Sequence, residues 1–329
     1  MAELIRQVRP AWVQLQQLPL PPHALRNALL ALGTGLLVMA GLASLSTFWA
    51  PTRAWWDAAE HGSAMAAGVQ ASLLAAVATA VGALPVFLVQ RVSKLQEAAL
   101  LSFSAGVMLA AAIFALLLPS LDAGQALFGG RTGAAALSGA GLALGMGLML
   151  AVDRFTPHEH AVLPPAAPGH AASAHTPGAV QSAKLMVLAI LIHNVPEGLA
   201  VGAAYAGPQD AAGAQAGASV ALAIGLQNMP EGLIVAMALR TLGRSAAQAW
   251  GVAALTGLAE PLGAILGLAV LGSLPAFYPL GLALAAGAML FVVSHEIIPE
   301  THRNGFETLA TGTLLAGFVF MLLLDAALN

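Results

Sequence analysis

Two short stretches of the sequence combine metal-ligand side chains with a proline inside otherwise apolar runs. They read HNVPEG at 193–198 and QNMPEG at 227–232. In each stretch the first residue and the glutamate are four positions apart, so on a helix they lie on the same face. Imidazole and carboxylate groups are ligands that divalent first-row metal ions accept. The two stretches therefore predict matching sets of metal ligands inside hydrophobic helices.

Three glutamates fall near the middle of apolar segments: Glu197, Glu231 and Glu260. A charge at the centre of a bilayer costs about 2.5–3.5 kcal/mol on insertion scales, and carboxylates close together also repel one another. A divalent cation bound between them would offset both costs. The alternative is a buried hydrogen-bonded network that only fixes helix packing, but an imidazole, amides and three acids at one depth favour a metal site.

A proline accompanies each of these acids. Pro196 and Pro230 lack an N–H, so each leaves the carbonyl four residues earlier without its helical donor. Pro261 follows Glu260 directly. Broken membrane helices expose such carbonyl oxygens to bound ions. One proline alone would indicate an ordinary kink, whereas three beside acids favour a binding site.

The composition places these stretches in a membrane protein. Of the 329 residues, 59% are hydrophobic and 8% are charged, whereas a soluble domain carries roughly 25% charged residues. The net charge of -3 gives no reason to expect a nucleic-acid partner. Because the chain contains no cysteine, disulfides and thiolate metal sites are excluded.

Crossing the hydrocarbon takes about 20 apolar residues in a helix. Nine segments qualify, near 24–47, 63–89, 96–121, 132–155, 184–206, 214–240, 246–273, 278–302 and 307–328. With the N-terminus in the cytoplasm, ten of the twelve lysines and arginines fall at the inner face. We therefore expect an all-α, multi-pass protein of the cell inner membrane, with a cytoplasmic N-terminal tail at 1–23 and an external C-terminus.

The longest internal loop, about 157–183, is rich in proline, alanine and glycine, which predicts a flexible cytoplasmic segment. It carries His158, Glu159, His160, His170 and His175. A weak metal-collecting segment and a merely polar linker are both open interpretations of this composition.

A short internal repeat relates SAGVMLAAAIFALLLP at 104–119 to AGAMLFVVSHEIIP at 286–299. In both, the pattern AG-x-ML is followed by a proline ten or eleven residues after the methionine. On the predicted topology the two helices run in opposite directions, which is typical of inverted repeats in transporters. Chance similarity between helices rich in small residues is the alternative.

These residues resemble the ZIP (Zrt-, Irt-like) family of divalent metal transporters, most of all its bacterial members. The resemblance covers 63–329 and rests on HNVPEG, QNMPEG, EPLG at 260–263 and SHEIIPETHRNG at 294–305. It implies an eight-helix bundle with an inverted repeat, to which 24–47 adds one extra N-terminal helix. It also implies uptake of Zn²⁺ into the cytoplasm, with Cd²⁺, Fe²⁺ and Mn²⁺ as further candidate substrates, and a homodimer, since family members are often dimers.

The resemblance further implies a paired metal site. One ion would use His193, Glu197, Gln227 and Glu231, and the other Asn194, Glu197, Asn228, Glu231 and Glu260. Met108 stands where some bacterial members bring a thioether to the site, although by itself it is equally an ordinary core residue. Many members carry histidine in place of Gln227, and some carry aspartate in place of Asn228. Two neutral amides at these positions leave the metal preference open.

Further polar residues suggest an approach to this site and an exit from it. Asp122 and Asp325 at the outer helix ends could draw cations inward, or could be ordinary interfacial acids. Toward the inner face, a hydrophilic path to the histidine loop is suggested by Asp153, His158, His295, Glu296 and His302.

Two rival functions follow from the same residues. An intramembrane metallohydrolase would need an open three-ligand zinc site plus a free acid, as in H-E-x-x-H, and neither stretch has that spacing. An efflux exchanger of the same fold would differ only in the direction of transport. We therefore predict a transporter rather than an enzyme, with divalent metal ions and the lipid bilayer as its partners.

Overall fold

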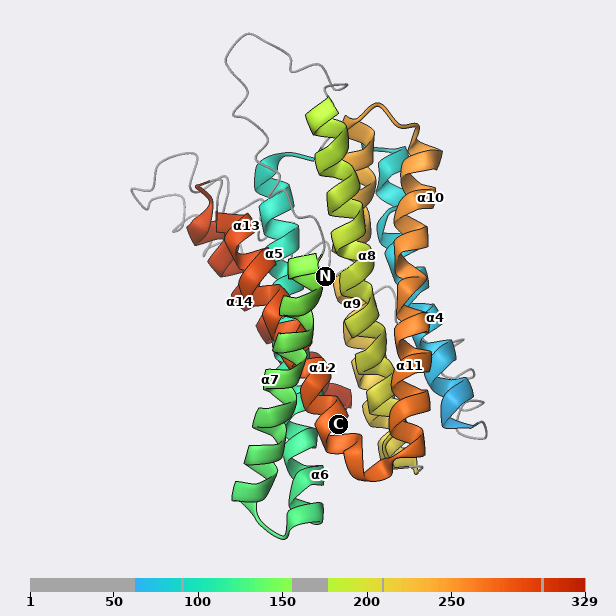
Figure 1. The fold of residues 1–329 in the computed structure, drawn as a ribbon. Helices are drawn as coiled ribbons and strands as arrows, with labels where there is room; N and C mark the ends of the chain where they lie inside the picture. Colours follow the sequence, from blue (N-terminus) through green and yellow to red (C-terminus); the bar gives the residue numbers. More distant parts are fainter. Residues whose placement is uncertain (1–62, 90–91, 156–176, 209, 303–304, 329) are drawn as a thin grey trace, which may run out of the picture. The chain divides into compact units, whose positions relative to one another are not determined.

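A computed structural model describes residues 63–89, 92–155, 177–208, 210–302 and 305–328. Every regular element among these residues is a helix (Figure 1), which confirms the predicted all-α fold class for this part of the chain. The tail predicted at 1–23 and the extra helix predicted at 24–47 lie outside the described residues.

The α-helices range in length from 5 to 31 residues. In chain order they are α4 (Ala64–Gly82), α5 (Lys94–Ala110), α6 (Leu118–Phe128), α7 (Arg131–Phe155), α8 (Pro177–Tyr205), α9 (Ala211–Thr241), α10 (Ala246–Gly257), α11 (Ala259–Ser273), α12 (Tyr278–Val292), α13 (Ile298–His302) and α14 (Glu307–Leu328). The local sequence stabilises the N-termini of α5 and α10. Ser93 and Ser245 each form a reciprocal capping box with a glutamine three residues later, Gln96 and Gln248 respectively.

Seven stretches of the described chain are long and apolar enough to cross a membrane. They are Ala64–Phe87, Lys94–Phe128, Arg131–Arg154, Gly213–Thr241, Ala246–Gly272, Tyr278–His302 and Glu307–Ala327. Each corresponds to a predicted span. Helix α8 takes the place of the span expected at 184–206 but is not among the seven, so the total of nine spans stays a prediction.

Helix α8 also corrects the extent of the predicted loop at 157–183. It begins at Pro177, so the last residues of that loop are helical. Proline suits the first helical position, because its missing N–H would have no partner there and its φ is already helical. His158 and the other residues at 156–176 lie outside the described part of the chain.

The helices pack in two groups. In the first, called the motif group because it contains HNVPEG and QNMPEG, α8 lies along α11, α9 lies along α4, and α10 packs against both α4 and α9. In the second, the flanking group, α12 lies along α7 and α14 along α5, with α6 against α7. Contacts of α5 with α9 and of α12 with α8 join the groups, which stand beside one another in Figure 1.

The predicted repeat has a structural counterpart. A π-helical segment at Ala111–Leu117 joins α5 to α6, and another at Val293–Ile297 joins α12 to α13. At the end of each, a backbone N–H bonds the carbonyl five residues earlier, Leu118 to Ile113 and Ile298 to Val293. A proline follows directly in both helices, and it could not have supplied an N–H to continue the regular ladder.

Candidate metal site

The two motif stretches lie in neighbouring helices, HNVPEG in α8 and QNMPEG in α9. Glu260 joins them from the first turn of α11. Six of the predicted ligands are at most 7% exposed: Asn194, Glu197, Gln227, Asn228, Glu231 and Glu260. Met108 is buried as well, in α5 of the flanking group. The structure therefore brings the six together as a buried polar cluster.

Hydrogen bonds within the cluster pair each acid with a neutral donor. Gln227 Nε2 donates to Glu197 Oε1 at 2.8 Å, linking α9 to α8. Asn228 Nδ2 donates to Glu260 Oε1 at 2.8 Å, linking α9 to α11. The third acid, Glu231, accepts a hydrogen bond of 2.8 Å from Ser104 Oγ on α5.

Several oxygens of the same side chains have no hydrogen-bond partner among the described residues. They are Asn194 Oδ1, Glu197 Oε2, Gln227 Oε1, Asn228 Oδ1 and Glu260 Oε2. Most buried polar atoms in folded proteins do have partners. Five buried acceptors from three helices, with no donor to satisfy them, are a donor set that suits a divalent cation.

His193 forms its hydrogen bond outside this acid–amide cluster. Its Nε2 lies 2.9 Å from Glu296 Oε1, in the π-helical segment after α12, and the two side chains are 12% and 22% exposed. In the described part of the chain, no group of three or more His, Asp or Glu side chains is arranged to hold a metal ion. The full ligand sets of the paired site, which include His193, therefore stay a prediction.

The helix break near the site lies at a different proline from the two in the motifs. Pro196 and Pro230 lie inside continuous helices, whereas α10 ends at Gly257 and α11 starts at Ala259, just before Pro261. Asn194 Nδ2 donates to the backbone oxygen of Thr256 at 2.9 Å. The carbonyl that contacts the site therefore belongs to the last turn of α10 and not to the residues before Pro196 and Pro230, and it accepts a hydrogen bond from Asn194.

The glycine that ends each motif allows a neighbouring helix to approach closely. A Cβ atom added at Gly198 would collide with the backbone of Glu260 in α11. One added at Gly232 would collide with the backbone carbonyl of Thr79 in α4. These contacts position Glu260 and Thr79 against the motif helices.

Sequence reasoning missed three residues that support the ligands. Ser104 bonds Glu231, Thr256 supplies a carbonyl to Asn194, and Thr79 Oγ1 lies 3.4 Å from Glu260 Oε1 as a donor. Second-sphere bonds of this kind orient metal ligands. The only sequence signal was that each is a hydroxyl residue within an apolar run.

Among the predicted exit residues, Glu296 contacts His193, and Asp153 and His295 are more exposed. Glu296 is 22% exposed, and Asp153 and His295, with Oδ2 and Nε2 3.8 Å apart, are 26% and 47% exposed. His295 also stacks on Phe291, with ring centroids 4.7 Å apart. His302 Nδ1 instead bonds the carbonyl of Ile298 in its own helix at 2.7 Å. Exposure therefore increases from the cluster through Glu296 to His295.

The predicted entrance residues lie outside the cluster. Asp122 is exposed on α6, where Gln125 Nε2 donates to its Oδ1 at 3.5 Å. Asp325 is half-buried near the end of α14. Both belong to helices of the flanking group, and their role in attracting cations stays a prediction.

Comparison with known proteins identifies the family. A family model described as "ZIP Zinc transporter" matches residues 156–325. The chain is 45% identical over 266 residues to the zinc transporter GufA of Myxococcus xanthus, which covers 80% of this chain and 100% of the relative. The chain belongs to the ZIP family.

Two further relatives extend this ZIP-family similarity. The zinc transporter ZIPB of Bordetella bronchiseptica is 41% identical over 329 residues, covering 100% of this chain and 99% of the relative. The human zinc transporter ZIP11 is 44% identical over 147 residues, 44% of this chain and 43% of the relative. Membership in the ZIP family, together with the seven membrane-length stretches of the described residues, confirms a multi-pass transporter of divalent metal ions rather than an enzyme.

Proposed function

We propose that this ZIP-family protein takes up Zn²⁺ across the cell inner membrane through an intramembrane site centred on Glu197, Glu231 and Glu260. The observation that carries the proposal is the set of buried acceptor oxygens on α8, α9 and α11 that have no donor among the described residues. Their number and burial suit a dehydrated divalent cation. Two relatives along the whole or most of the chain, GufA and ZIPB, are named zinc transporters, which supports Zn²⁺ as the substrate.

The site is proposed to hold two ions of unequal affinity. Glu197 and Glu231 would bridge them, one ion having His193 and Gln227 and the other Asn194, Asn228 and Glu260. Two divalent ions carry more positive charge than three carboxylates can neutralise. The amides of Gln227 and Asn228 are neutral and therefore contribute no further negative charge. One position is therefore strong and the other weak, which favours release.

Release follows the exposed side of the cluster. An ion leaving the acid–amide oxygens meets His193 and Glu296, and beyond them the more exposed Asp153 and His295. Because each step exchanges one set of ligands for a similar set, no position binds the ion too tightly for it to move on. Inward release requires the N-terminus to be cytoplasmic and the C-terminus external, the orientation that the lysines and arginines favour.

Movement of the motif group against the flanking group would expose the cluster alternately to the two sides. The ligands Glu197, Glu231 and Glu260 all belong to the motif group, so it can carry the metal as a unit. Repeat-related helices moving against one another are the common basis of alternating access. In the full chain, 63–329 forms this transporter, with the extra helix 24–47 before it and a homodimer as the assembly.

The test is metal flux in liposomes containing the purified full-length protein. We expect Zn²⁺ entry, with Cd²⁺, Fe²⁺ and Mn²⁺ compared in the same vesicles, and no entry for Glu197→Gln. The matched control is Glu97→Gln, which removes an acid that pairs with Lys94 near the start of α5. Flux that survives Glu197→Gln would overturn the site, and flux that occurs only outward against a proton gradient would indicate an exchanger.

A further inference from the structure

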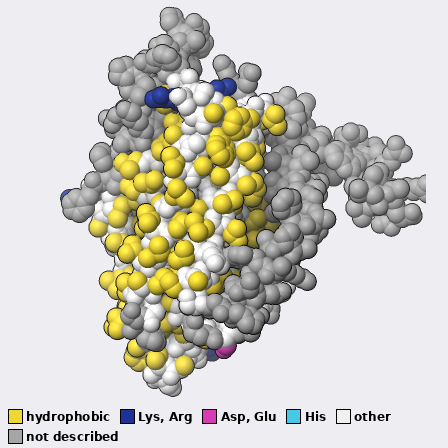
Figure 2. All heavy atoms as spheres, turned by 90° about the vertical axis from the view of Figure 1, so that its right-hand side faces the viewer, with side chains coloured by type: hydrophobic (Ala, Val, Ile, Leu, Met, Phe, Trp, Pro, Cys, Tyr) yellow, Lys and Arg dark blue, Asp and Glu magenta, His cyan; other side chains and the backbone are white. Residues whose placement is uncertain are grey.

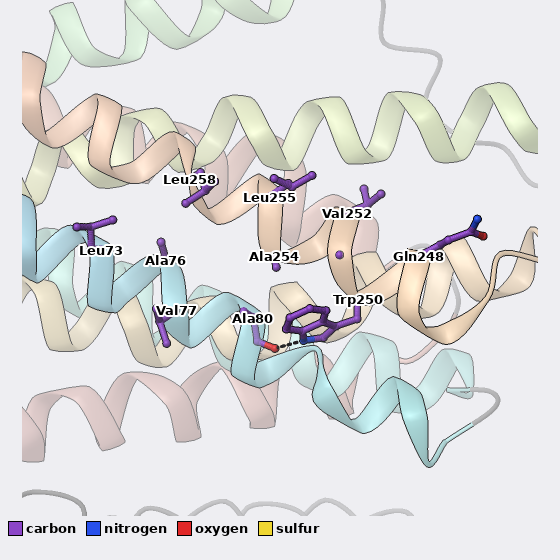
Figure 3. A pocket seen from close by; sticks show the side chains of 11 residues that line it. Leu73, Ala76, Val77, Ala80, Gln248, Trp250, Val252, Ala254, Leu255 and Leu258 are labelled. Carbon is purple, nitrogen blue, oxygen red and sulfur yellow. Dashed lines mark hydrogen bonds between the residues drawn. The ribbon is translucent and has the colours of Figure 1, made fainter.

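A groove lies on the outer face of the motif group, between α4 and α10. Its volume is about 630 Å³, and α4 contributes Leu73 and Val77 while α10 contributes Trp250, Leu255 and the adjoining Leu258 (Figure 3). The indole Nε1 of Trp250 donates to the carbonyl of Ala80 at 2.9 Å, so its one polar group is already used. The lining therefore offers carbon surface almost throughout.

This groove opens on a surface that has the character of a lipid-facing one. Val77 and Leu255 are 54% and 60% exposed, and both helices belong to stretches that are apolar and long enough to cross a membrane. Figure 2 shows the central band of this face covered by hydrophobic side chains, with basic side chains at its upper end. Nothing in the proposed metal path uses the groove.

Two arginines are linked to one lining residue of the groove by the sequence and by hydrogen bonds. Gln248, which lines the groove, accepts a hydrogen bond from the backbone N–H of Ser245 at 3.2 Å. Arg244 is the residue before Ser245, and Arg240 Nη1 donates to the carbonyl of Arg244 at 2.9 Å. Arg240 Nε is buried without a partner, and neither arginine has a carboxylate partner among the described residues.

We propose that this groove holds an acyl chain of an anionic phospholipid whose phosphate binds Arg240 and Arg244. The groove alone would not select a lipid, because lipid tails are as apolar as leucine and gain little by leaving the bilayer. Selection comes from the headgroup, since basic pockets at the ends of membrane helices bind anionic headgroups. The two guanidinium groups, which have no carboxylate partner among the described residues, and the apolar groove match the two halves of such a lipid.

This lipid would bear directly on the helices that hold the metal site. Arg240 ends α9, the helix of QNMPEG, and α10 supplies the Thr256 carbonyl that Asn194 contacts. A bound lipid bridges α4, α9 and α10, and so stabilises the motif group as one unit.

The test is native mass spectrometry of the full-length protein with phosphatidylglycerol and phosphatidylcholine of identical chains. We expect one phosphatidylglycerol to be retained in preference to phosphatidylcholine. Arg240→Gln and Arg244→Gln should each weaken retention about fivefold, and the double variant about thirtyfold. The matched control is Arg154→Gln, an exposed arginine at the end of α7, which should change retention less than twofold by the same reasoning. Equal retention of the two lipids, or no loss in the double variant, would overturn the proposal.

The groove itself is tested by filling it. Leu255→Trp and, as a second variant, Val77→Trp should each reduce phosphatidylglycerol retention, whereas Leu262→Trp, an exposed α11 position outside the lining, should not. A second measurement compares the rise in melting temperature caused by inorganic phosphate with that caused by phosphatidylglycerol. Equal rises would show that the site binds phosphate alone, and would overturn the proposal that the groove holds an acyl chain.

Other occupants of the groove give distinct results. Because the chain contains no cysteine, Leu255→Cys introduces a single thiol. Disulfide-linked dimers of this variant in phosphatidylglycerol vesicles would show a second copy on the groove and overturn the lipid assignment, whereas an unlinked thiol protected from a membrane-soluble maleimide by phosphatidylglycerol would support it.

Discussion

HNVPEG and QNMPEG have the same length and the same proline and glycine, yet their first residues do different things. Gln227 is fully buried and holds Glu197 through its amide. His193 is partly exposed and contacts Glu296 in the flanking group. The second residues differ too, since Asn228 bonds the side chain of Glu260 while Asn194 bonds a backbone carbonyl.

These contacts give the two motifs different roles, although their similar sequences suggest equivalent ones. QNMPEG organises the acids of the cluster, because its two amides donate to Glu197 and Glu260. HNVPEG connects the cluster to the more exposed residues, because the imidazole of His193 contacts Glu296, the first residue of the proposed exit path. The site is thus asymmetric in its contacts as well as in its ligands.

The largest effect is expected where the two stretches remain equivalent, at their glutamates. Loss of groups that merely support a metal ligand costs about 10–100-fold in affinity, so Glu197→Gln and Glu231→Gln should each reduce Zn²⁺ binding by more than this. Isothermal titration of the purified variants measures the affinity. A variant of either glutamate that binds like the original protein would contradict its role as a shared ligand.

The next effect concerns the glycine that closes each motif. Gly198→Ala places a methyl group against the backbone of Glu260, and overpacking a tight contact costs about 1–3 kcal/mol. We expect a lower melting temperature together with weaker Zn²⁺ binding, because Glu260 is displaced from the cluster. Thermal unfolding with and without Zn²⁺ measures both.

Gly147→Ala in α7 is the matched control for this substitution. An added Cβ there meets nothing within 4 Å, and alanine favours a helix interior over glycine by roughly 0.5–1 kcal/mol. It should therefore leave Zn²⁺ binding unchanged and stability equal or higher. If Gly198→Ala behaves in the same way, close approach of α11 is not required for the site.

Much of the fold could be predicted because a membrane imposes simple requirements on length and polarity. Apolar runs located the described helices, and the four-residue spacing placed each motif's ligands on one helix. Contacts between distant segments could not be found in this way. The pairs His193–Glu296 and Ser104–Glu231 join helices of different groups, and a single sequence contains no signal of which helices pack together.

The prolines show how a correct physical rule can be applied at the wrong place. Each proline removes one helical hydrogen bond, which made breaks at Pro196 and Pro230 reasonable. Both helices continue through the proline, as membrane helices can when neighbouring groups satisfy the freed carbonyl. At Leu258 the helix does break, between α10 and α11. Here Pro261 is combined with Gly257 four residues earlier, and glycine favours a helix end over a helix interior.

A moderate effect should follow from exchanging the first residues of the motifs. The double variant His193→Gln with Gln227→His keeps the composition of the site but moves the imidazole from a partly exposed position to a fully buried one. Zn²⁺ flux should fall about tenfold, the lower end of losses seen when metal-site support is removed. Unchanged flux would mean that the two stretches are interchangeable after all.

The smallest effect is expected at Glu296, which distinguishes binding from release. In Glu296→Gln, the charge-assisted hydrogen bond of His193 becomes a neutral one that is weaker by about 1 kcal/mol, so the imidazole is more readily available as a ligand. Zn²⁺ affinity should therefore rise about fivefold, while flux falls because the first exit ligand is weakened. Titration and liposome flux on the same preparation separate the two quantities, with Glu307→Gln at the start of α14 as the control. If affinity and flux fall together, Glu296 is instead part of the binding site. Both motifs would then serve metal binding, and HNVPEG would have no separate role in release.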